Sequence, residues 1–505
     1  MSLDILFIHP NASKKIYQEL SKDHSAYEPP IWAGMLANHC RSKNFKTAIL
    51  DCEVNKLDYE KSAKEINNFK PKIACFVVYG QQPSASSQNM EGATKTSIEL
   101  KKLNNEIKTL FVGGHVAALP KETLLKESSI DFVAMNEGVY SISNLLSADN
   151  LNEESYLKKI KGIGFRNNEN QIILNEPEIV VPKKLLEDDL PGIAWDLLPK
   201  LSEYRTAGWH SWSNNSDKQP FAALYTSLGC PYKCSFCMIN SINRTSNDFN
   251  LASDSFNVFR YWSPEFTIKQ LEYLADKGVK HLKIADEMFV YRPKHFMTLC
   301  ELIIDRGLDF NIWAYSRVDT AKPKYLETLR KAGVRHLALG IESANQTVRQ
   351  EIDKGRFKEV NIREVVDEIV KHDIGVGGNF IVGLPTDNYE TMQQTMNLAF
   401  ELDLANMNVY CSTALPGSPL YLNAKKEGRY LPEKYSEFGF LSYNHIPDST
   451  EFLTPAEVLA FRDYFFDAYF TNPGVLNRMK NKYGEKACEN IKRMTSIKLK
   501  RKILE

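Results

Sequence analysis

Short apolar runs alternate with amphipathic segments over the N-terminal part of the chain. The runs predict five strands, at Leu3–His9, Lys46–Asp51, Lys72–Tyr79, Thr109–Gly113 and Asp131–Met135. Segments of helical periodicity lie between them, such as Ile31–Lys43 and Glu91–Asn105. Strands that alternate with helices form parallel sheets that are covered on both faces. Residues 1–148 are therefore predicted to fold as a doubly wound, flavodoxin- or Rossmann-like parallel sheet.

A second alternating series, with a longer repeat, begins at Phe221. It predicts six strands, at Phe221–Ser227, His281–Asp286, Phe310–Ser316, His336–Ile341, Gly375–Val382 and Met407–Thr413. The helices between them have clear boundaries: Ser263 is a natural N-cap, Pro264 suits the first turn, and Gly278 ends the helix. Six βα units are fewer than the eight of a closed barrel. Residues 221–422 are therefore predicted to form a partial (β/α)6 TIM-like barrel.

The remaining segments are predicted to be a connector and a C-terminal helical extension. Residues 149–220 contain a hairpin at Lys161–Asn175, a linker, and the polar loop Trp209–Gln219, whose tryptophans are expected to pack on the core. In residues 423–505, Thr454 is expected to cap a helix. Residues 478–505 hold ten Lys or Arg against three Glu, a net charge of +7. An anionic partner is one interpretation of this basic tail, and a solvated helix face is the other.

Overall charge and hydropathy exclude several classes of protein. The chain has 63 Lys and Arg against 63 Asp and Glu, whereas binding to nucleic acid needs a basic excess. Its longest apolar run, near Ile73, is far shorter than the roughly 18 residues of a membrane span. The N-terminus lacks the features of a secretion signal. We therefore expect a cytoplasmic protein with no membrane span and no nucleic-acid partner.

Polar and glycine-rich residues follow several strands of the first series, at the sheet edge where such folds bind ligands. They are His9 and Asn11 after the first strand, Tyr79 and Gln81 after the third, and Gly113, Gly114 and His115 after the fourth. Paired glycines let a ligand approach the backbone closely. Neither GxGxxG nor GxxxxGKS/T occurs here, which argues against a dinucleotide or a nucleoside triphosphate. A tight turn without a ligand is the alternative.

Three of the nine cysteines form a cluster in the sequence. Cys230, Cys234 and Cys237 have the spacing CxxxCxxC and follow the first strand of the barrel. Three thiolates can hold a [4Fe–4S] cluster, which normally takes four, and leave one iron open to a small molecule. Catalytic zinc, with three protein ligands and a water, and unligated cysteines are the alternatives. The other six are expected to be small core residues, at positions 40, 52, 75, 300, 411 and 488.

These cysteines resemble the CxxxCxΦC signature of radical SAM enzymes, with Phe236 as the aromatic residue. The resemblance extends over residues 1 to about 425 and is closest to the cobalamin (B12)-binding subclass. It is carried, in order, by GGHVAALP, IDFVAMNEG, DDLPGIAWDLLP, SLGCPYKCSFCMI, ADEMF, SRVD, GIES, NFIVGLP and ALPGSPLY.

The resemblance implies a role for each matching position of the barrel. The three cysteines would hold three irons of a [4Fe–4S] cluster, and the fourth iron would chelate S-adenosylmethionine (SAM). The residues implied to bind SAM are Phe236, Asp286, Glu287, Arg317, Glu342, Asn379 and Gly383. A salt bridge to a neighbouring side chain is the alternative role for each charged residue at a strand end.

The resemblance also implies a cobalamin site in the first domain, with two departures from the usual motifs. No Asp-x-His occurs in the chain, so cobalamin would bind without the histidine of a DxHxxG motif. His115 is a candidate for the lower face of the cobalt, and a histidine bonded to its own turn is the alternative. Where relatives often have GEGE, this chain keeps only Glu137 and Gly138.

The chemistry that the resemblance implies is radical methylation. The reduced cluster would cleave SAM to a 5′-deoxyadenosyl radical, and cobalamin would deliver a methyl group to an unactivated carbon of a small metabolite. An electron donor such as flavodoxin or ferredoxin would be a partner. The alternatives are radical cyclisation, rearrangement or oxidation without methyl transfer, and a cobalamin- or metal-binding sensor without catalysis.

Overall fold

The predicted parallel sheet of the first domain is present. The computed structural model describes residues 3–80, 85–148, 150–212, 217–352 and 360–505. The parallel strands lie in the flavodoxin-like order β2-β1-β3-β4-β5 and span Ile5–His9 (β1), Thr47–Asp51 (β2), Ile73–Val77 (β3), Lys108–Val112 (β4) and Phe132–Ala134 (β5). Helices α2 (Ile31–Ser42) and α7 (Val139–Leu146) share one hydrophobic core with the sheet, whereas α3 (Tyr59–Phe69) and α4 (Ala85–Leu103) share the other. The sheet is therefore covered on both faces, as its apolar strands require.

The hairpin expected in the connector extends this sheet. Strands β6 (Ile163–Arg166) and β7 (Ile172–Leu174) pair antiparallel with each other, and β6 pairs antiparallel with β5. The predicted turn lies between them, with Asn170 in the left-handed region at φ 64°. Pairing covers the edge of β5, whose backbone groups would otherwise lack partners. The sequence located the hairpin, but its pairing with a strand 30 residues away was decided by packing.

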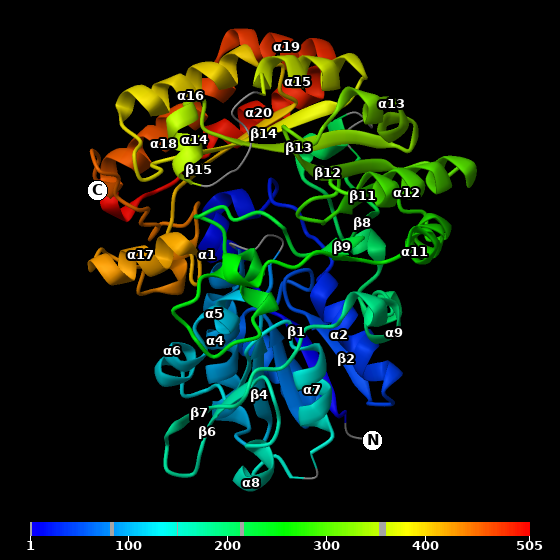
Figure 1. The fold of residues 1–505 in the computed structure, drawn as a ribbon, viewed down its shortest axis with the longest axis vertical. Coiled ribbons are helices and arrows are strands. Elements are labelled where there is room, and N and C mark those ends of the chain that lie inside the picture. Colours follow the sequence, from blue (N-terminus) through cyan, green and yellow to red (C-terminus); the bar gives the residue numbers. More distant parts are fainter. Residues whose placement is uncertain (1–2, 81–84, 149, 213–216, 353–359) are drawn as a thin grey trace.

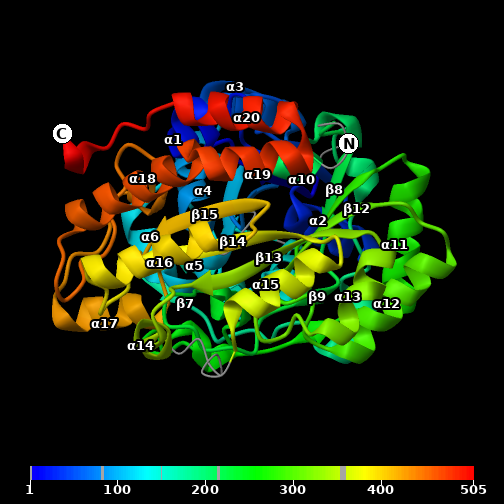
Figure 2. The same cartoon turned by 90° about the horizontal axis from the view of Figure 1, so that it is seen from above.

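The second sheet is an open half-barrel. Its six parallel strands follow the chain order and span Phe221–Leu224 (β8), His281–Ile284 (β11), Asn311–Arg317 (β12), Val334–Glu342 (β13), Gly375–Val382 (β14) and Asn406–Cys411 (β15). The outer helices cover its convex side (Figure 2): α11 (Pro264–Asp276), α12 (Pro293–Asp305), α13 (Pro323–Lys331), α15 (Ile362–Lys371) and α16 (Tyr389–Glu401). The sheet ends at β8 and β15, which confirms the partial barrel.

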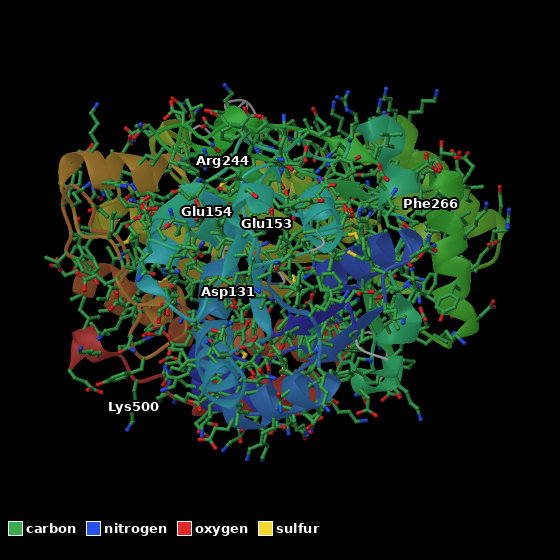
Figure 3. The ribbon with its side chains drawn as sticks, turned by 90° about the horizontal axis from the view of Figure 1, so that it is seen from below. Asp131, Glu153, Glu154, Arg244, Phe266 and Lys500 are labelled. Atoms are coloured by element: carbon green, nitrogen blue, oxygen red, sulfur yellow. The ribbon has the colours of Figure 1, made fainter. Side chains whose placement is uncertain are left out.

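The two α/β units are stacked, with the sheet unit below the barrel in Figure 1. The loops that follow the strands of the first sheet meet the segment after the first barrel strand: a Cβ atom on Gly114 would lie 3.1 Å from Cε of Met238. Viewed from below (Figure 3), Asp131, Glu153 and Glu154 mark the sheet unit, and Phe266 marks the barrel side. The carboxyl ends of the first sheet therefore point toward the mouth of the barrel.

The segment that follows β1 and the C-terminal helices cover the open side of the half-barrel. The N-terminal part is α1 (Ser13–Tyr17) with η1 (Gln18–Ser21), and the C-terminal part is α18 (Pro455–Thr471), α19 (Pro473–Tyr483) and α20 (Glu485–Ser496). The side chain of Gln18 joins the two: its Nε2 donates to the carbonyl of Leu441 at 2.8 Å, and its Oε1 accepts from the backbone N–H of Lys500, which Figure 3 labels.

The connector and the C-terminal tail both make contacts with the rest of the chain. Trp212 is buried, as expected for packing on the core, whereas Trp209 packs edge-on against Trp313 and also lines a cavity; residues 213–216 of that loop lie outside the described residues. Thr454 caps α18 in a capping box with Glu457. Part of the basic tail is paired internally, for example Lys498 with Asp467 at 2.6 Å. No helix in the described part of the chain is both long and apolar enough to cross a membrane.

Candidate functional site

The three clustered cysteines lie in one loop at the mouth of the barrel. The loop follows β8 and the short strand β9 (Ser227–Leu228). Cys230, Cys234 and Cys237 are partly exposed, whereas the other six cysteines are buried, as predicted for them. Gly229 starts the loop at φ 85°, where a Cβ atom would lie 2.1 Å from the carbonyl oxygen of Val258. Only glycine fits this turn, so the backbone can bend directly from the strand into the cysteine loop.

Polar side chains from the following segment hold the loop by its backbone. Asn240 donates to the carbonyl of Cys230 at 3.0 Å and accepts from its N–H at 3.3 Å. Asn257 donates to the carbonyl of Pro231 at 3.2 Å, and Ser253 donates to that of Cys237 at 2.8 Å. These supports were missed by sequence reasoning, because asparagine and serine in a polar loop have no distinguishing pattern. They fix the loop without using the thiols.

The three clustered thiols influence one another electrostatically, but among the described residues they do not form a single-ion site. Burial, followed by the nearby Cys234 and Cys230 thiols, raises the pKa of Cys237, so the three cysteines form one electrostatic group. Among the described residues, however, no three His, Cys, Asp or Glu side chains converge closely enough to hold one metal ion. Zinc requires such convergence at about 2.3 Å per thiolate. A cubane cluster takes one thiolate at each of several irons, so its thiolates stand farther apart.

Asp286 lies beneath the cysteine loop and supports it. The residue is fully buried after β11, and burial raises its pKa to about 6. One carboxylate oxygen accepts from the N–H of Thr226, and the other accepts from the hydroxyls of Thr226 and Ser227, all at 2.6 Å. Both oxygens are therefore used to fix the chain just before Gly229. These contacts give Asp286 a positioning role, while its predicted contact with SAM stays a prediction.

Glu287, the next residue, has a buried carboxylate oxygen with no donor. Its Oε2 atom has no hydrogen-bond partner among the described residues. Burial raises the pKa of Glu287 to about 8, and the neighbouring Asp286 acts in the same direction. The charge of Glu287 also contributes to the raised pKa of Cys237, which places the two side chains near each other. A buried acceptor without a donor is a suitable position for the amino group of a ligand.

The other residues predicted to bind SAM are distributed around the same mouth. Arg317 is buried and pairs with Asp319 at 2.8 Å. Its charge also interacts with that of Cys234, which places the two side chains near each other. Phe236 packs against a small hydrophobic group formed by Val348, Ile352 and Leu384. Glu342 ends β13 in the left-handed region, at φ 63°. The structure thus brings the cysteine loop, Glu287, Arg317 and Phe236 together.

Two predicted SAM residues have other clear roles. Gly383 follows β14 at φ 76°, where a Cβ atom would lie 2.3 Å from Cγ1 of Val458, so the position packs against the C-terminal helix α18. Asn379 lies within β14, accepts from Nδ2 of Asn408 at 3.0 Å and donates to the carbonyl of Leu339. Asn379 faces the interior of the barrel and lines the cavity described below.

At the carboxyl edge of the first sheet, most predicted ligand residues are bonded to protein. His9 contacts Glu53 at 3.3 Å, and the side chain of Asn11 accepts from Ser13 at the start of α1. His115 contacts the hydroxyl of Ser87 at 2.9 Å, and burial lowers its pKa to about 3, so it is neutral. Gln81 lies outside the described residues. His115 is thus bonded to α4 and not to its own turn, which was the alternative interpretation, and its role near the cobalt stays a prediction.

The remaining residues predicted at this edge form its turns and a buried ion pair. Tyr79 stacks on Trp32 with ring centroids 4.1 Å apart. Gly113, at φ 150°, leaves no room for a Cβ atom next to the carbonyl of Val78. Gly138 precedes α7 at φ 85°, and Gly114 starts α5 (Gly114–Ala118). Glu137 is 1% exposed and binds the guanidinium of Arg260 through both carboxylate oxygens, at 2.7 and 3.1 Å.

A cavity of about 350 Å³ lies between the two units. Its wall combines residues from the carboxyl edge of the first sheet, the barrel interior and the C-terminal segments that cover the open side. Among them are Tyr17, Glu28, Gln88, Lys283, Trp313, Tyr315, Asn379, Asn408, Phe440 and Arg462. The volume is at the small end of the range for ligand pockets. No sequence motif marked this cavity, because its wall is assembled from segments far apart in the chain.

A buried ion pair in the wall of the cavity joins the two units. Nζ of Lys283, on β11, lies 2.9 Å from Oε2 and 3.1 Å from Oε1 of Glu28. The ammonium group also lies 4.7 Å from the ring centroid of Trp313. The side chains of Lys283 and Glu28 are 1% and 6% exposed. The interior therefore combines aromatic surface and amides with a charge pair of zero net charge.

Sequence comparison identifies both units. The model of the Radical SAM superfamily matches residues 224–399, and that of the B12 binding domain matches residues 25–146. An uncharacterized methyltransferase of Pyrococcus horikoshii is 28% identical over 399 residues, which are 78% of each chain. The anaerobic magnesium-protoporphyrin IX monomethyl ester cyclase of Rubrivivax gelatinosus is 25% identical over 501 residues, 95% of this chain and 80% of that one.

Structure comparison shows that the whole arrangement has a precedent. The radical S-adenosylmethionine methyltransferase TsrM of Kitasatospora setae, solved with cobalamin and a [4Fe–4S] cluster bound, superposes with a TM-score of 0.65. The match covers 98% of this chain and 100% of that one at 13% identity. At this identity the likeness shows a shared fold, including the stacking of the two units and the C-terminal helices.

Proposed function

Because this chain is a radical SAM enzyme of the cobalamin-binding subclass, we propose that it methylates an unactivated carbon of a small molecule. Its cofactors are a [4Fe–4S] cluster, SAM and cobalamin. The observation that supports the proposal most is the cysteine loop, because Met238, which directly follows it, meets the carboxyl edge of the B12 binding domain at Gly114. A substrate would occupy the cavity between the two units, which is lined by the barrel interior, by the carboxyl edge of the first sheet and by the C-terminal segments, and by no described residue of the cysteine loop.

The residues of the barrel mouth fit the cluster and SAM. Cys230, Cys234 and Cys237 would each bind one iron, and side chains of the following segment hold their loop by its backbone. The Oε2 atom of Glu287, which has no donor among the described residues, would accept from the SAM amino group. Bound together, the cofactors supply one-electron cleavage of SAM and a carrier for the methyl group.

The sheet unit fits a cobalamin that takes no histidine from the protein. His9 and His115, the histidines predicted at this edge, already contact Glu53 and Ser87. His115 would have to give up its contact with Ser87 and its packing against Tyr435 to reach a ligand. We therefore propose that neither His9 nor His115 would be a ligand of a bound cobalamin. The cavity residues Tyr17 and Gln88 would border the cofactor on the barrel side.

The chain's own residues would also exclude water and position the substrate. A hydrogen bond between Gln18 and Lys500 joins the segment after β1 to the C-terminal segment over the open side of the barrel. Asn379 and Asn408 present amides to the cavity, and Trp313 presents an aromatic surface. With Lys283 and Glu28 neutralising each other, the lining suits a small substrate with a planar group and hydrogen-bonding atoms, rather than a polyanion.

The products distinguish methylation from the other radical outcomes. We expect the reconstituted enzyme, given its substrate and a strong reductant, to form S-adenosylhomocysteine and 5′-deoxyadenosine together, because one SAM donates the methyl group and another the radical. Both products are measured by mass spectrometry during incubation with a small-molecule extract, together with a substrate gain of one CH2. Formation of 5′-deoxyadenosine alone would favour cyclisation, rearrangement or oxidation, in line with the cyclase relative. Tight cobalamin binding without either product would favour the sensor.

The Glu287→Gln variant tests the SAM site. At a pH above about 8, where the carboxyl group of Glu287 is ionised, we expect SAM to bind about ten- to a hundredfold more weakly, because a hydrogen bond to a charged group contributes about 1.5–3 kcal/mol. Calorimetric titration of SAM into the reconstituted protein measures this change. The matched control is Glu301→Gln, an exposed glutamate on α12, which should leave the affinity unchanged. Equal affinities for wild type and Glu287→Gln would remove Glu287 from the site.

A further inference from the structure

A row of partly exposed aromatic rings extends from the cysteine loop along the protein surface. It starts at Tyr232, which lies between Cys230 and Cys234 in the sequence. The ring centroid of Tyr232 lies 5.9 Å from that of Tyr291, which lies 5.0 Å from Phe259, which in turn lies 6.0 Å from Tyr261. All four rings are partly exposed. The row therefore extends from the cysteine loop to Tyr261 through successive ring contacts.

Three exposed cations surround the outer end of this row. Nζ of Lys183 lies 3.6 Å from the ring centroid of Tyr261, and the guanidinium of Arg292 lies 5.0 Å from that of Tyr291. A hydrogen bond from Lys183 lowers the pKa of Tyr261, and the charges of Lys183, Arg292 and Lys294 act in the same direction. We call Lys183, Arg292, Lys294 and the rings of Tyr261 and Tyr291 the entry patch.

The entry patch is not explained by the internal packing of the chain. None of its three cations forms an ion pair within the part of the chain that the structure describes. Glu187 and Asp188 follow Lys183 in the connector, and Glu187 accepts from the N–H of Ser263 at the start of α11. Lys183 comes from the connector, and Arg292 and Lys294 from the start of α12, more than 100 residues later. Exposed rings bordered by unpaired charges are typical of an interaction surface.

We propose that the entry patch docks a small electron carrier with an acidic face, of the flavodoxin class. The inference rests on the proposed function, which places the cluster at the cysteine loop. One electron leaves the reduced carrier and reduces the oxidised cluster by one unit; no atom or proton is transferred. Cations around the contact steer an acidic partner and set its orientation. The aromatic row then provides a continuous series of ring contacts between the docked carrier and the cysteine loop, along which the electron can move.

Charge reversal at the patch tests the proposal. The variant Lys183→Glu/Arg292→Glu/Lys294→Glu is reconstituted with cluster and cobalamin, and 5′-deoxyadenosine formation is measured with reduced flavodoxin or with dithionite. We expect the flavodoxin-driven rate to fall at least about tenfold at low salt, the lower bound for electrostatic steering. The dithionite-driven rate should be unchanged, because this small reductant needs no docking. Raising the salt should slow the wild type and speed the variant, because salt screens the attraction in the first and the introduced repulsion in the second.

The matched control changes net charge by the same amount elsewhere. Lys277, Lys426 and Lys486 are exposed on other faces, and their replacement by Glu should leave the flavodoxin-driven rate unchanged. An equal loss in this control, or no loss in the patch variant, would overturn the proposal. If the patch variant also loses the dithionite-driven rate, the milder Lys183→Gln/Arg292→Gln/Lys294→Gln variant decides: a loss with flavodoxin alone supports docking, and no loss rejects it. Wild type inactive with both reductants would instead refute the proposed function.

Discussion

Replacing Cys234 by alanine is expected to abolish the iron–sulfur absorption of the reconstituted protein and its formation of 5′-deoxyadenosine. With three cysteines in the loop, each would hold one iron, and the six other described cysteines, including Cys411 at the end of β15, are buried. Removing a residue that only orients a metal ligand already costs about ten- to a hundredfold. Loss of the ligand itself should exceed that. The same result is expected for Cys230→Ala, for Cys237→Ala and for the triple variant.

Cys300→Ala is the matched control for this series. Cys300 is buried in α12, and burial raises the pKa of its thiol, as expected for a core residue. Its replacement should lower stability slightly and leave the cluster intact. Iron and sulfide content, the absorption spectrum and 5′-deoxyadenosine are measured on each variant. A triple variant that still forms 5′-deoxyadenosine would show that the cleavage chemistry does not depend on this loop.

Glu137→Gln is expected to destabilise the folded protein by about 3–5 kcal/mol, the cost of breaking a buried ion pair. The side chains of Arg260 and Glu137 are 2% and 1% exposed, so the variant leaves a buried guanidinium without its counter-charge. The pair also fixes the connector, because Glu137 accepts from the N–H of Val181 at 2.6 Å and Arg260 donates to its carbonyl at 2.7 Å. Denaturant unfolding of the apoprotein, followed by circular dichroism, measures the loss.

Two further variants separate the ion pair from simple packing. Glu327→Gln breaks the pair of Glu327 with Lys331, whose side chains are 72% and 63% exposed, and should cost less than about 1 kcal/mol. The double variant Glu137→Leu/Arg260→Met removes both charges and should be more stable than Glu137→Gln, because no unpaired charge is left buried. If Glu137→Gln and Glu327→Gln are equally mild, the pair does not hold the two units together.

The features that could be predicted from the sequence are those formed by residues close together in the chain. The strand and helix positions followed from hydrophobic periodicity, and the helix starting after Thr454 followed from its cap. The cysteine loop was identifiable because its three thiols lie within eight residues. The half-barrel followed from counting six βα units. Each of these features depends on local sequence, so packing had little freedom to change it.

The roles of single acidic residues could not be predicted in this way. Asp286 and Glu287 are adjacent and look equivalent in the sequence, yet Asp286 is bonded to Thr226 and Ser227 while one oxygen of Glu287 has no donor. Glu137, predicted near cobalamin, proved to be the partner of Arg260. The direction of a side chain after a strand depends on the loop packed against it. Sequence position alone does not contain that information.

The sequence by itself determined the elements, the two sheets and the cysteine loop, because local periodicity and spacing act over a few residues. Only the tertiary structure decided the cavity, the entry patch and the ion pairs that join the units. Glu137 and Arg260 are 123 residues apart in the chain, and Glu28 and Lys283 are 255 apart. Such pairs form only when the two units stack. Burial then makes an unpaired charge costly, so each of these charges depends on a partner that no local pattern marks.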